Sequence, residues 1–164
     1  MKKLILAVLL IAVASFYSFK DKELVTVSKD NIPQIFFVDR KLHRLISHDF
    51  PEDGNPDTLC KKLVNNIISG RDENREILRL IPNEKGIISV KVKNDSAYVD
   101  LSETLISKIS KNPENERLVV YQLVNSLTSV DGINYVTFTI DGKSRKDFLG
   151  FLDMREIFTP NYDI

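Results

Sequence analysis

The chain has 164 residues, of which 43% are hydrophobic and 28% are charged, a composition typical of an ordinary folded domain. Its 23 basic residues balance its 23 acidic residues, so bulk charge gives no basis for binding nucleic acid. The single cysteine excludes an internal disulfide and a four-cysteine zinc site.

The first segment combines a basic start with an apolar run. Lys2 and Lys3 precede residues 4–19, which carry no charge. A run of this length without a polar face is typical of a signal peptide or an N-terminal membrane anchor rather than a buried helix. We expect residues 1–19 to form this segment and residues 20–32 to form a polar linker. Both alternatives predict an extracytoplasmic chain, either secreted or held at the membrane through residues 4–19.

The next part of the chain contains short apolar runs separated by polar turns. Residues 34–38 predict a buried strand, and residues 42–47 predict a second strand or an irregular arm. Two prolines and a glycine in residues 49–57 predict a loop. Residues 77–81 are apolar, and Pro82 ends that run.

Two helices are expected, each with the same start signal. Asn55 and Asn112 are suited to N-cap positions, because each is followed by a proline and an acidic residue. Gly70 is expected to end the first helix. The apolar positions repeat at helical spacing: Cys60, Leu63, Val64 and Ile67 in the first helix, and Val120, Leu123, Val124 and Leu127 in the second.

Alternating apolar residues predict three strands with one solvated face each. The apolar positions are Ile88, Val90 and Val92, then Ala97, Val99 and Leu101, and finally Val136, Phe138 and Ile140. Asn94-Asp95 and Asp141-Gly142 are predicted turns. Residues 148–158 predict one more short strand and an arm.

The order of these elements is strand, arm, helix, hairpin, helix, strand. It predicts an α+β fold, in which a small mixed β-sheet has two α-helices packed on one face.

Two runs of short motifs resemble a known family. They are Leu80-Ile81-Pro82 with Val99-Asp100-Leu101-Ser102, and Val124-Asn125-Ser126-Leu127-Thr128 with residues 136–140 and Asp141-Gly142. In this order and spacing they resemble the GerMN domain of sporulation and spore-germination proteins, over residues 33–164. The chain departs from the family pattern at Gly70-Arg71, where a Gly-Pro pair is usual, and it has room for one such domain rather than two.

The resemblance implies a ring-building-motif-like fold and a non-enzymatic, extracytoplasmic module at the bacterial cell envelope. It also marks positions that we expect to be structural: Pro82, Asp100, Ser102, Glu116, Asn125, Thr128, Asp141 and Gly142.

The residues themselves offer little catalytic chemistry. Asp100 and Ser102 are interpreted as a cap or turn, and Glu116 as a charge that stabilises a helix N-terminus rather than a general acid or base. His43 and His48 do not have convincing metal-ligand spacing. Cys60 lies on the buried stripe of a helix, so we expect an inert thiol. We therefore expect no enzyme activity, no cofactor and no metal.

Two functions remain open. The first is protein–protein assembly with an envelope partner or with other copies of the chain, in sporulation or germination. The second is binding of cell-wall glycan or peptide, for which Tyr98, Tyr121 and Tyr135 are candidate contacts. Tyr98 and Tyr135 side by side on the surface would favour glycan binding, whereas a contiguous apolar patch at a sheet edge would favour assembly.

Overall fold

A computed structural model describes residues 32–69, 76–82 and 86–164. The predicted signal segment, residues 1–19, lies outside the described residues, as does all but the last residue of the predicted linker, 20–32. Within the described ranges, none of the helices is both long and apolar enough to cross a membrane.

The described part of the chain forms these elements, in order: β1 (Gln34–Asp39), β2 (Leu45–Asp49), α2 (Pro56–Ser69), β3 (Ile77–Leu78), β4 (Ile87–Lys93), β5 (Ser96–Leu101), α3 (Glu103–Ile106), α4 (Pro113–Thr128) and β6 (Tyr135–Ile140). Of the two alternatives for residues 42–47, the strand is confirmed, although it begins three residues later and extends to Asp49, at the start of the expected loop.

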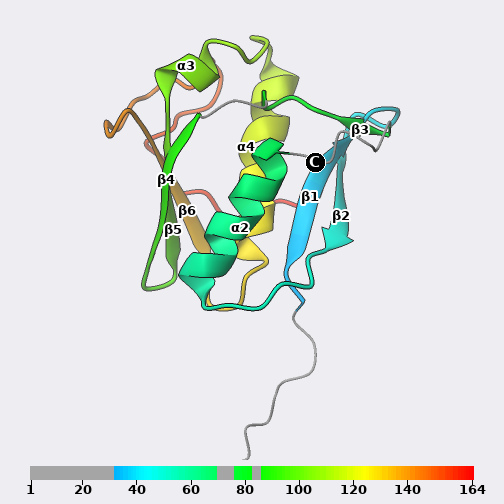
Figure 1. Cartoon of the computed structure of the whole chain (residues 1–164). Helices are drawn as coiled ribbons and strands as arrows, with labels where there is room; N and C mark the ends of the chain where they lie inside the picture. The colour runs from blue at the N-terminus through cyan, green and yellow to red at the C-terminus, as the bar shows by residue number, and fades with distance from the viewer. Residues whose placement is uncertain (1–31, 70–75, 83–85) are drawn as a thin grey trace, which may run out of the picture. The chain divides into compact units, whose positions relative to one another are not determined.

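The strands form two sheets, with α2 and α4 between them (Figure 1). In the first sheet, β5 pairs antiparallel with β4 and parallel with β6, so this sheet is mixed. In the second sheet, β1 pairs antiparallel with β2 and β3. The α+β class is thus confirmed, and the small mixed sheet does have both helices on one face. The second sheet was not expected, because the pattern of a short strand does not reveal its partner.

Helix α2 begins as its sequence predicts. The side-chain oxygen of Asn55 accepts a hydrogen bond from the Thr58 amide at 2.9 Å, which satisfies a free N–H of the first turn. The predicted stripe from Cys60 to Ile67 is buried. The expected terminator, Gly70, lies outside the described residues.

Both predicted turns are present. Asn94, between β4 and β5, has a positive φ of 56°. Asp141 and Gly142 have φ values of 47° and 72°, and the backbones of Ile140 and Lys143 exchange hydrogen bonds of 2.9 and 3.0 Å across them. Two consecutive positive φ values define a tight turn that aspartate and glycine adopt more readily than other residues.

Helix α4 is buried around most of its circumference. Its N-cap is Asn112, as predicted, whose side chain accepts from the Asn115 amide at 2.7 Å. The predicted apolar stripe is buried, but so are polar residues outside it: Glu116, Gln122, Asn125 and Ser126. The helix contacts strands of both sheets. The periodicity of the sequence indicated only one of these covered sides.

Two serines, one in α4 and one at its C-cap, bind the backbone of β1. Ser126 Oγ accepts a hydrogen bond from the Phe36 amide at 2.9 Å, and Ser129 Oγ accepts one from the Gln34 amide at 2.8 Å. Ser129 also donates to the Gln34 carbonyl at 2.9 Å. Because β3 pairs only with the other end of β1, these serines replace a neighbouring strand at the open edge.

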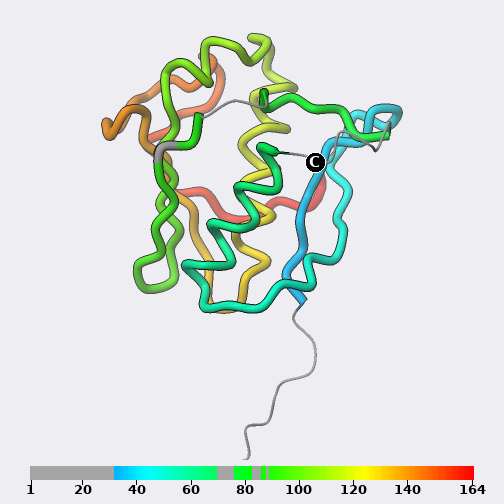
Figure 2. Tube along the Cα trace, in the orientation of Figure 1, coloured from blue at the N-terminus to red at the C-terminus, as the bar shows by residue number. Residues whose placement is uncertain are grey.

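The prediction of a short strand within residues 148–158 is wrong. That part of the chain forms only isolated bridges, of which one joins Val136 to Phe158 and another joins Asp147 to Asp153. The apolar side chains of this segment are part of the core although their backbone is irregular. An apolar run in the sequence therefore predicted that the residues are buried, but not that they form a strand. In Figure 2 the red tail runs from the mixed sheet to the second sheet, where the Leu45 amide donates to the Ile164 carbonyl at 3.0 Å.

We predict that Ser126→Ala lowers the free energy of unfolding by about 1–3 kcal/mol, because the Phe36 amide loses its acceptor in a buried position. The matched control is Ser69→Ala in α2, where the serine is exposed and its hydroxyl donates to the Asn65 carbonyl of the same helix. Chemical denaturation of both variants measures the difference. Equal stability of the two variants would contradict the assigned role of Ser126.

Candidate functional site

Two of the family-motif positions organise the ends of β5 and β6. Asp100 Oδ1 accepts hydrogen bonds from the Thr139 hydroxyl at 2.7 Å and from the Gly142 amide at 2.8 Å. Ser102 Oγ accepts from the Leu105 amide at 3.1 Å and is the N-cap of α3. The cap interpretation is confirmed for Ser102, whereas Asp100 stabilises the turn after β6 by accepting from the Gly142 amide.

Glu116 lies in the first turn of α4, where its charge was expected, and it has a second structural role. Its side chain is fully buried, at 0% exposure. Its carboxylate accepts three backbone hydrogen bonds from the C-terminal segment: from Leu149 at 3.0 Å, Phe151 at 2.9 Å and Leu152 at 3.0 Å. The sequence indicated only the position of this carboxylate near the start of its own helix. The carboxylate is also the acceptor around which a loop folds, since a buried charge requires several strong donors.

The remaining motif positions are also structural. Asn125 exchanges two hydrogen bonds with the Asn161 backbone, of 2.7 and 2.9 Å. Thr128 donates to the Val124 carbonyl of its own helix at 2.8 Å. Pro82 is half-buried at the end of a described range. The motif residues thus maintain the fold and do not gather into one site.

The candidate reactive residues do not come together either. Cys60 is fully buried, and the desolvation of its thiol, with a smaller contribution from the nearby Asp57 charge, raises its pKa to about 12. His43 lies in a turn with φ 49°, and His48 lies on β2 against the Phe37 ring, 5.9 Å between centroids. Among the residues that the structure describes, no group of three or more histidine, cysteine or acidic side chains can hold a metal ion.

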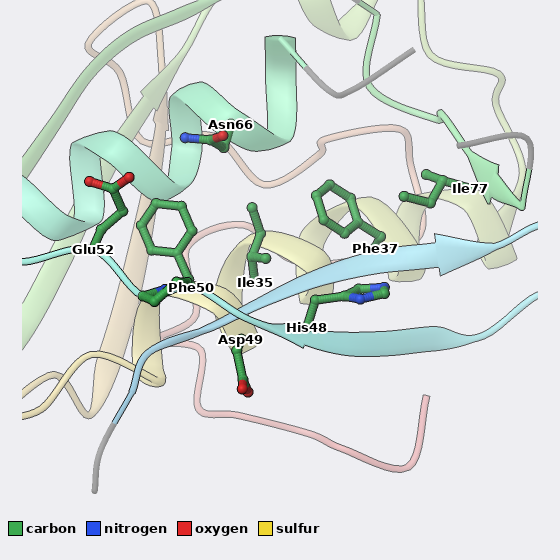
Figure 3. Close-up of a pocket in the computed structure, with 9 residues that line it drawn as sticks. Ile35, Phe37, His48, Asp49, Phe50, Glu52, Asn66 and Ile77 are labelled. Carbon is green, nitrogen blue, oxygen red and sulfur yellow. The ribbon is translucent and has the colours of Figure 1, made fainter. Parts of the chain in front are cut away.

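A pocket of about 480 Å³ lies between the second sheet and α2. Figure 3 shows Ile35, Phe37 and Phe50 pointing toward the helix that carries Asn66. The residues that line it are Ile35, Phe37, His48, Asp49, Phe50, Pro51, Glu52, Asn66 and Ile77. The volume lies within the range of ligand pockets, about 300–1,000 Å³. Sequence reasoning missed this pocket, because the same apolar residues predict ordinary core.

The outer face of the mixed sheet is the second candidate surface. Tyr98 on β5 is 44% exposed and Tyr135 on β6 is 39% exposed. Ser96 pairs with Tyr135 and Tyr98 pairs with Thr137, so the two tyrosines are diagonal neighbours on one face. Lys91 of β4 pairs with Tyr98 on the same face.

The third tyrosine considered from the sequence does not belong to this face. Tyr121 is half-buried and packs edge-on against Phe158, with 6.2 Å between ring centroids. It therefore contributes to the core rather than to a binding surface.

Comparison with known proteins identifies the domain. The family model described as "Germane: Sporulation and spore germination" matches residues 34–146. None of the curated proteins matches the chain.

Solved structures with a similar fold come from two organisms. The first GerMN domain of the sporulation protein GerM from Bacillus subtilis is 18% identical, with 77% of this chain and 96% of that chain covered and a TM-score of 0.63. The tandem GerMN domains of the same protein are 16% identical, with 77% and 45% covered and a TM-score of 0.62. A candidate lipoprotein from Clostridium perfringens is 19% identical, with 82% and 93% covered and a TM-score of 0.58. At these identities the likeness establishes the fold.

We predict that Glu116→Gln destabilises the chain by on the order of 3 kcal/mol, because the amide group of glutamine replaces one acceptor oxygen with a donor that faces backbone N–H groups. Glu114→Gln is the matched control, since Glu114 is exposed in the first turn of the same helix. Thermal and chemical unfolding compare the two variants. A loss no larger than that of the control would show that the carboxylate is dispensable.

We also predict that Cys60 resists alkylation in the folded chain. At pH 8 a thiol whose pKa is about 12 has a thiolate fraction on the order of a thousandfold below that of an ordinary cysteine. Iodoacetamide labelling followed by mass spectrometry, with and without denaturant, measures this difference. Labelling at the same rate in both conditions would contradict the buried, inert assignment.

Proposed function

Because the chain belongs to the Germane (GerMN-domain) family of sporulation and spore-germination proteins, we propose that it is a non-enzymatic, extracytoplasmic module that assembles with other proteins at the bacterial cell envelope. Its mechanism is surface complementarity. The described motif residues stabilise loops and turns, and this is consistent with a domain whose task is to hold its surfaces in place.

The location rests on the N-terminal sequence. The uncharged run of residues 4–19 after two lysines is suited to export or to anchoring at the membrane. The similar protein from Clostridium perfringens, named as a candidate lipoprotein, supports an envelope location. The domain then faces partners outside the cytoplasm.

The observation that carries the proposal is the outer face of the mixed sheet. Tyr98 and Tyr135 are exposed there as diagonal neighbours, and by the criterion given above this pair on its own favours glycan binding. Assembly is favoured by the exposed apolar side chain that adjoins the same sheet. Ile157 is 65% exposed, and it adjoins Phe158, which bridges to β6. Phe158 packs inward on Phe138, whereas the Ile157 side chain beside it is left in solvent. Tyrosine is enriched at the centres of protein interfaces, where its ring adds large contact area.

Binding of cell-wall glycan is the second candidate function. The same pair of tyrosines favours it, because two aromatic rings on one flat face can stack on successive sugar rings. Lys91 and the hydroxyl of Thr137 on this face would then supply polar contacts. The two functions differ in what contacts this face: a protein in the first and a cell-wall fragment in the second.

The test is photo-crosslinking of the tagged full-length chain in its own host. A benzophenone amino acid replaces Tyr98 or Tyr135 in turn, and replaces the exposed Asn65 of α2 as the control. We expect discrete protein adducts from positions 98 and 135 and none from position 65. Mass spectrometry of the adducts identifies the partner.

Two results would contradict assembly through this face. Adducts on cell-wall fragments in place of protein would establish the glycan-binding alternative. The absence of any adduct from positions 98 and 135, with the variants folded and exported, would remove both functions from this surface.

A further inference from the structure

A short loop after β6 is fixed from inside the domain. Residues 147–153, here called the Phe151 loop, are closed at the base by the bridge between Asp147 and Asp153 and by a hydrogen bond of 2.8 Å from the Met154 amide to the Lys146 carbonyl. The Glu116 carboxylate accepts three amides within the loop. The backbone of the loop is therefore held by a buried charge.

This loop presents an aromatic ring to solvent. Phe148 and Leu149 point into the core, at 5% and 7% exposure, whereas Phe151 is 54% exposed. An exposed aromatic side chain on a fixed backbone loses little conformational entropy when it is bound, which is the property of an interface anchor. Phe151 is not part of the hydrophobic core, so binding to another molecule explains its position better than a contribution to folding does.

The same chain carries a pocket of matching chemistry. Phe37, Phe50 and Ile35 give the 480 Å³ pocket an apolar lining, and an aromatic side chain fits within that volume (Figure 3). In Figure 2 the orange chain directly after β6 lies on the side of the mixed sheet, before the red tail crosses over, whereas the blue and cyan strands of the pocket lie on the other side of the helices. The ring that enters the pocket must then come from another molecule.

Charges beside the two features are complementary. Residues 49–53, the acidic segment, border the pocket and carry Asp49, Glu52 and Asp53, all exposed. Only Glu52 of these is in an ion pair among the described residues, with Lys62 at 2.7 Å.

Residues 143–146, the basic segment, directly precede the Phe151 loop and carry Lys143, Arg145 and Lys146, also exposed. Arg145 pairs with Glu103, whereas Lys143 and Lys146 are in no ion pair among the described residues. Asp49 Oδ1 accepts a hydrogen bond from Gln34 Nε2 at 2.9 Å, Lys146 interacts with Asp153, and the exposed Asp141 and Asp147 flank the basic segment. A second copy can still place Lys143 and Lys146, which are in no ion pair within the described ranges, against Asp49 and Asp53 as its ring enters the pocket.

We propose that Phe151 of one copy inserts into the pocket between β1, β2 and α2 of a second copy, with the basic segment of the first copy against the acidic segment of the second. This inference rests on the proposed function, because it names one partner of the assembly. The contact is head-to-tail, since the two surfaces are different. Such contacts continue from copy to copy into a ring or a filament.

The test uses two differently tagged full-length chains expressed together. A benzophenone amino acid replaces Phe151 in the donor chain, so that an aromatic group stays at that position and captures even a weak contact. We expect an adduct with the acceptor chain, mapped by mass spectrometry to pocket residues such as Phe37 or His48. The control probe replaces Ile157, which is exposed to a similar degree, and should not label the pocket.

Two sets of variants test the geometry and the charge. Asn66→Trp in the acceptor places a bulky ring at the pocket mouth and should lower the adduct yield roughly tenfold, whereas Asn65→Trp, on the next exposed position of α2, should not. Lys143→Glu with Lys146→Glu in the donor should lower the yield, and Asp49→Lys with Asp53→Lys in the acceptor should restore it.

The outcomes separate this inference from the proposed function. Adducts from position 151 with a different envelope protein would overturn the second copy as partner and leave assembly intact. Adducts between two 151 positions, or an equal yield with Asn65→Trp and Asn66→Trp, would overturn the pocket contact. The absence of protein adducts from positions 98, 135 and 151 together would overturn both.

Discussion

A buried polar group must be hydrogen-bonded, and this requirement organises the domain around α4. Within the described residues, the buried polar side chains are all on this helix: Glu116, Gln122, Asn125 and Ser126. Three of them hold another segment by its backbone. Loss of a partner would leave a desolvated charge or amide, which costs more than a lost surface contact. The helix therefore fixes strands and irregular chain alike.

This arrangement explains how an irregular C-terminal part is held in place without a β-ladder. The Phe151 loop is bound through Glu116, and the last residues are bound through Asn125 and through the end of β2. Side chains on such segments have defined positions, as they would on a strand. The buried polar residues of α4 thus hold the surface segments in fixed positions. A domain that binds partners through its surface requires this rigidity.

Local signals predicted most of the elements, because their causes lie within a few residues. Asn55 and Asn112 cap helices, and Asp141-Gly142 forms a tight turn. The pairing of β3 with β1 and the role of Glu116 depend on partners more than 30 residues away: Val38 pairs with Leu78, and Glu116 accepts from the Leu149 amide. A sequence pattern shows that such a residue is in a helix but not what its side chain meets. The short motifs of the family resemblance gave positions such as Glu116 and Asn125 but not the segments that these side chains bind.

Amide hydrogen exchange of the full-length chain, followed residue by residue, tests the central role of α4 most directly. The account predicts that the amides of Leu149, Phe151 and Leu152, together with that of Asn161, exchange as slowly as the amides of the mixed sheet, although they belong to no strand or helix. Exchange of these amides at the rate of an open loop, while the sheet stays protected, would contradict it.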